Sequence, residues 1–179
     1  EVVFQKTYGV KNLESKEPVD GNTLFNMAST TKAVVAIAMG MLVDDGKLNW
    51  DDKVVDHLPY FKLSDPYITA DARIKDLLTH NLGIGNADAL WTVDSLTTRE
   101  TIRKFQFAKK AYPLRGGFTY QNIMYAVAGE VIAAASGKPW NEFVAERIFN
   151  PLEMNRTQAL ASAIFNVGNY VTPYADDPE

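Results

Sequence analysis

The stretch from Phe25 to Gly46 constrains the fold of this chain more than any other, because small polar residues run straight into a periodic apolar segment. Its apolar residues recur at the three-to-four spacing of an amphipathic helix: Val34, Val35, Ile37, Ala38, Met41 and Leu42. Asp45 and Gly46 follow, and glycine readily adopts the left-handed conformation that ends a helix. The sequence therefore predicts a central helix that opens near Ser29 and ends at Asp45-Gly46.

Ser29 and Lys32 stand three residues apart at the start of this predicted helix. Side chains at that offset share a face, with Cβ atoms about 5–6 Å apart, so a hydroxyl can meet an amine. The N–H groups at a helix start have no internal partner and favour negative charge. A serine placed there can become a nucleophile if the lysine accepts its proton. Serine is also a preferred helix cap, so this pair alone leaves capping and catalysis both open.

Tyr120-Gln121-Asn122 leads into a second strong helical pattern, which covers residues 122–136. A phenol held near a lysine ammonium has its pKa lowered by the opposite charge, and it can then transfer protons as base and acid. The structural alternative is a packed tyrosine with a satisfied hydroxyl, beside an asparagine that caps the helix. These three residues alone do not separate the two interpretations.

Composition favours a single globular domain and disfavours several kinds of binding site. With 179 residues, 46% of them hydrophobic, the chain can form one domain over 1–179 with a sizeable core. A net charge of −4 and the lack of a basic run disfavour a nucleic-acid partner. No cysteine is present, which excludes disulfides and thiolate-bound metals, and the two histidines do not form a His-Glu-x-x-His zinc motif. The apolar run of residues 33–43 is too short to span a membrane.

The remaining elements follow from shorter patterns. We expect a strand over residues 2–10, where β-branched and aromatic residues gather, and a loop over 60–72, which contains Pro66. Further helices are predicted at 51–58, 73–78, 99–107 and 139–148. Thr97 or Thr98 would cap the helix of residues 99–107, with Glu100 in its first turn. Residues 157–172 are ambiguous between helix and extended chain.

Several motifs occur together and in order along nearly the whole chain. Besides Ala28-Ser29-Thr30-Thr31-Lys32 and Tyr120-Gln121-Asn122, they are Tyr8-Gly9-Val10, Thr23-Leu24-Phe25, Asp45-Gly46-Lys47-Leu48-Asn49, Leu77-Leu78-Thr79-His80, Ala135-Ser136-Gly137-Lys138-Pro139-Trp140 and Pro151-Leu152-Glu153-Met154. With these the chain resembles the serine β-lactamase and penicillin-binding superfamily. The resemblance is to its class C β-lactamase-like branch, which includes D-aminopeptidases, DD-peptidases and serine esterases.

The resemblance implies an α/β (α+β) architecture, with an antiparallel sheet flanked by helices and a mostly helical lobe beside it. The third motif of the family, a Lys or His followed two residues later by Gly on a sheet strand, does not occur here, because Ser136-Gly137-Lys138 has the wrong order and place. We therefore expect a mainly helical chain that lacks the C-terminal strands and is a portion of a longer protein. Two more positions depart from the family pattern. The family usually has Ser or Thr where this chain has Leu82, and Gly where it has Glu153.

The resemblance also implies roles for the motif residues. Ser29 would be the acylated nucleophile, its backbone N–H would form half of the oxyanion hole, and Lys32 would accept or relay its proton. Tyr120 would be the second acid/base group, and Asn122 would hydrogen-bond a substrate amide or the Lys32 ammonium. Acyl transfer through an ester needs no metal or organic cofactor. The substrate would be a small molecule or peptide, such as a D-amino-acid peptide, a β-lactam or an ester.

Alternatives of another class remain open. The chain could be a catalytically silent penicillin sensor or scaffold module of the same fold, or an inactive fragment. The sheet-facing side of the Ser29 helix would be exposed in a free chain, which points to self-association or to a missing C-terminal segment that completes the sheet. Members of the superfamily are often periplasmic or secreted, but the sequence leaves the location unknown.

Other polar and aromatic residues have ordinary structural interpretations. The resemblance makes the His80 loop structural, and His57 is expected at the surface. Glu130 interrupts an apolar helix and is expected on its solvated face. Trp91 and Tyr112 would either line the entrance to a site or pack elsewhere.

Overall fold

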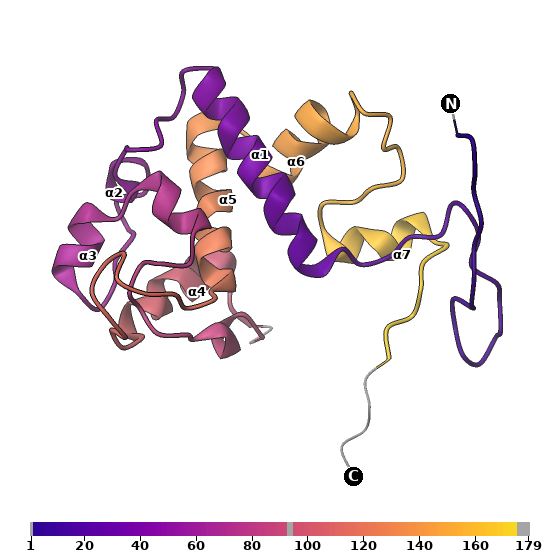
Figure 1. The fold of residues 1–179 in the computed structure, drawn as a ribbon, viewed down its shortest axis with the longest axis horizontal. Helices are drawn as coiled ribbons and strands as arrows, with labels where there is room; N and C mark the ends of the chain where they lie inside the picture. The colour runs from indigo at the N-terminus through magenta and orange to yellow at the C-terminus, as the bar shows by residue number, and fades with distance from the viewer. Residues whose placement is uncertain (1, 93–94, 175–179) are drawn as a thin grey trace, which may run out of the picture.

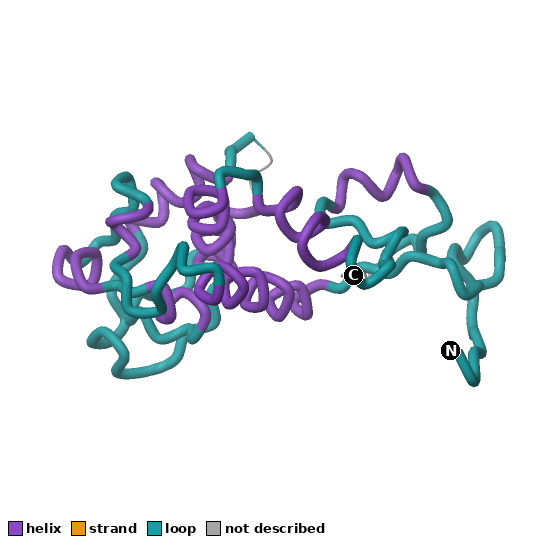
Figure 2. Tube along the Cα trace, turned by 90° about the horizontal axis from the view of Figure 1, so that it is seen from above, coloured by secondary structure: helices purple, strands orange, loops and turns teal. Residues whose placement is uncertain are grey.

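The computed structural model describes residues 2–92 and 95–174, and the side chains of Trp91 and Thr92 lie outside that description. The described part is mainly helical (Figures 1 and 2). Its α-helices are α1 (Thr31–Asp44), α2 (Val54–His57), α3 (Pro66–Asp71), α4 (Thr98–Lys104), α5 (Asn122–Ser136), α6 (Trp140–Val144) and α7 (Ile164–Val167). Short 3-10 segments are η1 (Ala28–Thr30), η2 (Ile74–Leu78), η3 (Asp88–Thr92), η4 (Phe105–Phe107) and η6 (Ala161–Ala163), and η5 (Ala145–Phe149) is a π-helical turn.

The core is organised around α5, which contacts α1, α2, α4, α6, η2 and η3. α1 crosses directly against it, as Figure 1 shows. The side chains that close this contact are fully or almost fully buried: Val35, Ala38, Met39 and Leu42 from α1, with Val127, Ala128, Val131 and Ile132 among those of α5. Burial of such apolar side chains contributes about 1.5–3 kcal/mol for each large one. The pairing of α1 with α5 is therefore the main packing contact on which the rest of the fold is assembled.

The predicted ends of the principal helices are confirmed. Gly46 follows α1 with φ +69°, and Gly137 ends α5 with φ +75°, both in the left-handed region that glycine allows. α4 begins with the expected cap: Thr97 Oγ1 accepts the Glu100 N–H at 3.2 Å, and the Glu100 carboxylate accepts the Thr97 N–H at 2.8 Å. This reciprocal pair satisfies two of the donors that a helix start leaves free.

The loop predicted over 60–72 is wrong, because α3 occupies Pro66–Asp71. The Asp65 carboxylate accepts the N–H groups of Tyr67 and Ile68, at 2.9 and 3.1 Å. Pro66 stands at the first helical position, where a missing N–H costs nothing. Three other predicted helices are shorter or broken: 51–58 is helical only over Val54–His57, 99–107 divides into α4 and η4, and 139–148 becomes α6 followed by η5.

The strand predicted over residues 2–10 is also wrong. Within residues 2–92 and 95–174 the backbone forms only isolated bridges, and Val10 bridges Pro18. Val2, Val3 and Phe4 are 77–91% exposed, because no neighbouring strand of the described chain pairs with them. A strand needs such a partner to hold its backbone donors and acceptors. Further along the chain, the backbone near Leu24 pairs with the C-terminal segment, since Leu24 donates its N–H to Asn169 O at 2.8 Å.

The loops before the start of α5 are held by an ion pair between Arg115, whose side chain is 35% exposed, and the buried Asp76. Arg115 donates to both oxygens of Asp76, at 2.9 and 2.6 Å, and to the Asp71 carboxylate at 2.9 Å. The Asp76 side chain is 3% exposed and also accepts the Arg73 N–H, which starts η2. Asp76, and then Asp71, hold the pKa of the Arg115 guanidinium above its ordinary value. This network joins the loop of residues 112–117 to α3 and η2.

His80 joins the loop after η2 to Gln121, the residue that precedes α5. Its Nδ1 accepts the Gln121 N–H at 3.1 Å, and its carbonyl accepts the Thr119 N–H at 2.9 Å. The Tyr112 hydroxyl donates to the same carbonyl at 3.3 Å. Burial, reinforced by the Lys32 ammonium, lowers the pKa of the His80 imidazole below its ordinary value of 6.5. The neutral ring is the form that can accept from Gln121, so the fold is built for unprotonated His80.

We expect Asp76→Asn to lower the free energy of unfolding by about 2 kcal/mol, because it leaves the Arg115 guanidinium without its buried counter-charge. Urea denaturation measures this change. Lys75→Met is the matched control: the Lys75–Asp51 pair is 50% and 59% exposed, so solvent screens it and its loss should change the free energy of unfolding far less. Equal losses from the two substitutions would contradict a structural role for the Asp76–Arg115 pair.

We expect the stability of the wild-type chain to fall as the pH drops below about 6.5, because the unfolded chain then binds a proton at His80 that the folded chain resists. His80→Asn should flatten that part of the profile. Asparagine tolerates the φ of +58° at this position, and its carboxamide oxygen can accept the Gln121 N–H. Urea denaturation of both proteins between pH 5 and pH 8 provides the measurement. Parallel profiles would show that His80 does not carry the dependence.

Candidate active site

The site begins in the turn that leads into α1. Ala28, the residue before Ser29, has φ +45°, a left-handed conformation that costs an alanine roughly 1–2 kcal/mol. Asn26 Oδ1 accepts the Ala28 N–H at 2.7 Å, and the Thr30 hydroxyl donates to Met27 O at 2.6 Å. These local bonds hold a strained turn and place Ser29 just ahead of α1.

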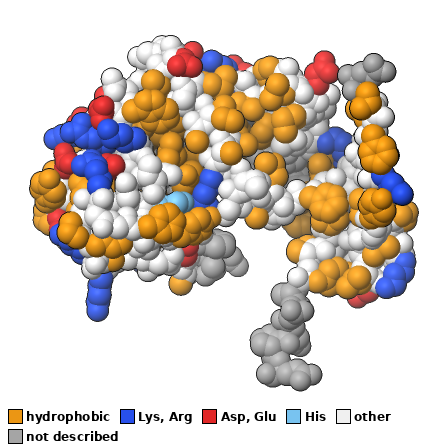
Figure 3. Space-filling model, in the orientation of Figure 1, with side chains coloured by type: hydrophobic (Ala, Val, Ile, Leu, Met, Phe, Trp, Pro, Cys, Tyr) orange, Lys and Arg blue, Asp and Glu red, His pale blue; other side chains and the backbone are white. Residues whose placement is uncertain are grey.

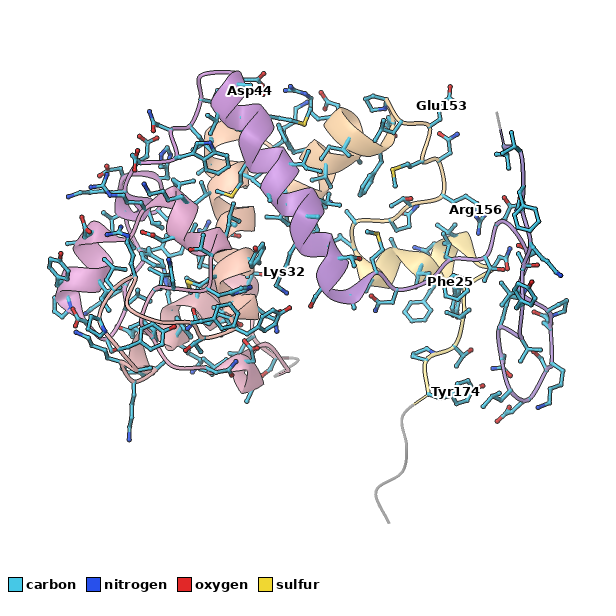
Figure 4. The ribbon with its side chains drawn as sticks, viewed as in Figure 1. Phe25, Lys32, Asp44, Glu153, Arg156 and Tyr174 are labelled. Atoms are coloured by element: carbon cyan, nitrogen blue, oxygen red, sulfur yellow. The ribbon has the colours of Figure 1, made fainter. Side chains whose placement is uncertain are left out.

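The packing of α1 on α5 brings the starts of the two helices together. Lys32 lies in the first turn of α1, and Figure 4 shows its side chain between α1 and α5. Tyr120 lies two residues before the first residue of α5, and Asn122 is that first residue. Residues about 90 positions apart in the chain are therefore brought into hydrogen-bond contact.

One continuous set of hydrogen bonds joins the four predicted site residues. The Tyr120 hydroxyl donates to Ser29 Oγ at 2.6 Å, and Lys32 Nζ donates to the same oxygen at 3.2 Å. Lys32 Nζ also donates to Asn122 Oδ1 at 2.6 Å. Tyr120 is 39% exposed, so solvent and small molecules can reach this group. The structure thus brings together all four residues that the sequence singled out.

The charge of Lys32 acts directly on Tyr120. Its Nζ lies 4.6 Å from the centroid of the Tyr120 ring and 5.2 Å from that of Tyr125. The Lys32 ammonium, followed by the Ser29 hydroxyl, holds the pKa of the Tyr120 phenol below its ordinary value of 10.0, while the Asp88 carboxylate opposes this effect. A phenol with a lowered pKa is a better base near neutral pH. Because a hydroxyl both donates and accepts, the contact with Ser29 can pass a proton in either direction.

A layer of residues behind Tyr120 fixes its position. The His80 and Tyr120 rings stack with centroids 4.5 Å apart. Gln121, which is 2% exposed, donates from Nε2 to Ile84 O and, at 3.4 Å, to Gly85 O. These contacts hold the phenol ring and the residue that follows it, next to the hydroxyl that donates to Ser29.

One acidic residue at this site, Asp88, belongs to none of the motifs found in the sequence. Asp88, in η3, accepts the Asn122 N–H through Oδ1 at 3.1 Å and the Asn122 carboxamide through Oδ2 at 2.8 Å. The two residues are 34 positions apart and share no periodic pattern, so only the tertiary fold brings them together. A search for an acid that could cap the start of α5 is the one signal that points to it.

The other residues considered from the sequence lie outside this group. His57 contacts Asp52 at 3.1 Å, and Glu130 accepts from Tyr60 at 2.7 Å. Tyr112 packs under Gly117 and holds the His80 carbonyl, while the side chain of Trp91 is outside the described residues.

Leu82, which departs from the family pattern in the His80 loop, packs into the hydrophobic core and is 1% exposed. At Gly83, which has φ +81°, a Cβ would come within 2.4 Å of Tyr112 O, so only glycine fits there. The chain can therefore turn closely at this loop although Leu82 departs from the family pattern.

Two general features complete the description of the site and its surroundings. In the described ranges, no group of three or more His, Asp or Glu side chains is arranged to hold a metal ion. None of the helices in those ranges is both long enough and apolar enough to cross a membrane.

Comparison with known proteins was made for sequence and for structure. The sequence profile of the Beta-lactamase family matches residues 1–178. The chain is 32% identical over 187 residues to the unguisins hydrolase ungD of Aspergillus violaceofuscus. This alignment covers 99% of this chain and 33% of that protein. It is 30% identical over 195 residues to esterase EstB of Burkholderia gladioli, covering 98% of this chain and 48% of the esterase.

Solved structures show the same fold. The octameric penicillin-binding protein homologue from Pyrococcus abyssi superposes with a TM-score of 0.83 at 27% identity, over 99% of this chain and 42% of that one. The D-amino acid amidase from Ochrobactrum anthropi SV3, complexed with L-phenylalanine amide, superposes with a TM-score of 0.71 at 30% identity, over 84% and 42%.

These matches agree with one another, and the relatives named as hydrolase, esterase and amidase are enzymes. The chain spans between a third and a half of the length of the curated relatives given above. Because the family profile covers almost every residue and the β-lactamase/transpeptidase-like fold is the same, this chain belongs to the Beta-lactamase family.

Proposed function

We propose that this chain carries the acylating residues of a serine hydrolase that cleaves an ester, an amide or a β-lactam through Ser29. The observation that supports this most strongly is the double hydrogen bonding of Ser29 Oγ, to the Tyr120 hydroxyl at 2.6 Å and to Lys32 Nζ at 3.2 Å. A serine with a cap role alone would need neither partner. An activated serine needs a neighbouring group that can take its proton.

In the proposed reaction Ser29 Oγ attacks the acyl carbon of the substrate. As the new C–O bond forms, the hydroxyl proton passes to Tyr120 in its phenolate form or to Lys32 in its neutral amine form. The leaving amine or alcohol takes that proton when its bond to the acyl carbon breaks, which leaves an acyl ester on Ser29. Water then attacks the ester, gives a proton to the same base, and releases the acid as Ser29 regains its proton.

Lys32 and Tyr120 have complementary roles in this proposal. The Lys32 ammonium lowers the pKa of the Tyr120 phenol, so the phenolate form is more accessible to act as base. Asn122 Oδ1 holds the lysine side chain at 2.6 Å and keeps it directed at Ser29. The Ser29 N–H stands near a helix start, where donors lack internal partners, and would stabilise the oxyanion of the tetrahedral intermediate.

The proposed substrate class is a small acyl compound or peptide. Relatives named as an esterase and as a D-amino acid amidase support both ester and amide cleavage. The 39% exposure of Tyr120 is consistent with entry of a substrate from solvent.

We extend the proposal to the uncovered side of α1. Ile37 of α1 is 54% exposed, and Phe25 and Met27, in the segment before the helix, are 60 and 43% exposed. Figure 3 shows hydrophobic side chains over this part of the chain. Either sheet strands from outside residues 1–179 or a second copy of the chain would cover this side. The octameric state of the Pyrococcus abyssi homologue supports the possibility of self-association.

Intact-mass spectrometry after treatment with a fluorophosphonate and with a penicillin tests the proposal. We expect one adduct on the wild type and none on Ser29→Ala. Tyr120→Phe should slow adduct formation by about 100-fold or more, the contribution of a positioned acid/base group. Ser136→Ala is the matched control, since this serine ends α5 and, among the described residues, its hydroxyl hydrogen-bonds the backbone of Lys138. It should react as the wild type does.

Circular dichroism shows whether each variant is folded. A folded wild-type chain that gives no adduct with either reagent would contradict the proposal. A permanent penicillin adduct without turnover of ester or amide substrates would instead favour a sensor of the same fold.

A further inference from the structure

The contacts of Asp88 fix more than the start of a helix. Its Oδ1 accepts the Asn122 N–H at 3.1 Å, and its Oδ2 accepts the Asn122 carboxamide at 2.8 Å. Asn86 donates to the same Oδ2 at 3.2 Å and also to Tyr120 O at 2.8 Å. Asp88 is only half-buried, but its two oxygens have three donors, all from residues at or beside the proposed site.

These contacts determine which way the Asn122 carboxamide faces. An ionised carboxylate only accepts hydrogen bonds, so the NH2 end of the carboxamide must face Asp88. The oxygen end then faces Lys32, whose Nζ donates to it at 2.6 Å. If the carboxamide turned over, two donors would face each other at Lys32 and an acceptor would face the carboxylate. One acid therefore selects one of the two orientations.

We propose that Asp88 is a positioning residue of the active site, which orients Asn122 so that its oxygen directs Lys32 toward Ser29. The inference rests on the proposed function, because it concerns the same site. Asp88 touches none of the reacting atoms and acts through Asn122.

Asp88 also contributes its charge to the group around Tyr120. Five elements supply the groups that act on Tyr120: the Ser29 hydroxyl from η1, and the ionisable side chains of Lys32 from α1, His80 from the loop after η2, Asp88 from η3 and Tyr125 from α5. The Asp88 carboxylate raises the pKa of the Tyr120 phenol and so opposes Lys32. Removal of this charge should move the acidic limb of the acylation profile, where Tyr120 gains its proton, to lower pH.

Asp88→Asn is the substitution that separates positioning from capping. It keeps the shape, and its single carboxamide oxygen can still cap α5 at the Asn122 N–H. Its NH2 group would then face the Asn122 NH2 group, so the two-point contact that selects the orientation is lost. Asp65→Asn is the matched control, because Asp65 caps α3 through two N–H groups and has no contact with Asn122 or Tyr120 among its described hydrogen bonds.

The experiment has two readouts on the 179-residue chain. The first is the rate of Ser29 labelling by a fluorophosphonate between pH 5 and pH 10. For Asp88→Asn we expect a plateau about tenfold lower, the effect of losing a hydrogen bond to a charged group, together with an acidic limb at lower pH. The second is the hydrogen exchange of the Asn122 NH2 group by NMR, assigned with Asn122→Ala, which should become faster in Asp88→Asn. Asp65→Asn should match the wild type in both readouts.

The two readouts keep the inference and the proposed function apart. An Asp88→Asn profile and exchange rate equal to those of the wild type would overturn the positioning role. If the wild type itself is not labelled, the proposed function fails, and the NMR readout still decides whether Asp88 orients Asn122. If Asp88→Asn does not fold, Asp88→Glu replaces it, because it keeps the charge but shifts both oxygens. Slower labelling or faster Asn122 exchange in Asp88→Glu supports the inference, and wild-type values in both overturn it.

Discussion

The site depends on the packing of α1 against α5, because neither helix alone contains the residues that meet at Ser29. The two helices pack against each other, and Val35, Ala38 and Leu42 of α1 are buried in the core that they share. Once that packing is set, the first turn of α1 and the first residue of α5 can meet at only one place. The Lys32–Asn122 hydrogen bond of 2.6 Å lies there and joins the helix starts. A shift of one helical turn along the contact would move Lys32 by about 5.4 Å and separate it from both Ser29 and Tyr120.

The packing of the two helices brings the site residues together, and polar contacts then fix the positions of their side chains. Arg115 and Asp76 hold the loop before Tyr120 in place, and His80 stacks against the phenol from behind. Asp88 orients the Asn122 carboxamide in the way proposed above. Each of these residues comes from a loop or a short 3-10 segment rather than from the two long helices. The helices thus provide the rigid frame, while the surrounding loops provide the electrostatic environment of the Ser29 hydroxyl.

The parts of the site that sequence could predict are those governed by local geometry. The Ser29–Lys32 contact follows from a three-residue offset at a helix start, and both long helices were predicted from apolar spacing and terminal glycines. Pairing of Tyr120 with Ser29 could be expected only from the resemblance to a family, since spacing carries no information over 91 residues. Asp88 belongs to no motif, so it was missed.

The two errors in secondary structure also have physical causes. Pro66 by itself indicates a loop, but after the capping residue Asp65 it begins a helix. Val2, Val3 and Phe4 have the composition of a strand, yet a strand exists only where a neighbour supplies hydrogen bonds. In both cases the residues have a local conformational preference, but the neighbouring residues or the missing strand partner determine the secondary structure that forms.

In the proposed reaction Lys32 activates the phenol that contacts Ser29, and the pKa of Tyr120 reports this effect. Tyrosine Cζ chemical shifts, followed by NMR across alkaline pH and assigned with Tyr120→Phe, give that pKa without requiring any substrate. We expect a Tyr120 pKa below 10.0 in the wild type and a higher one in Lys32→Met, because the ammonium that favours the phenolate is gone. A wild-type value at or above 10.0 that does not respond to Lys32→Met would contradict this role of Lys32.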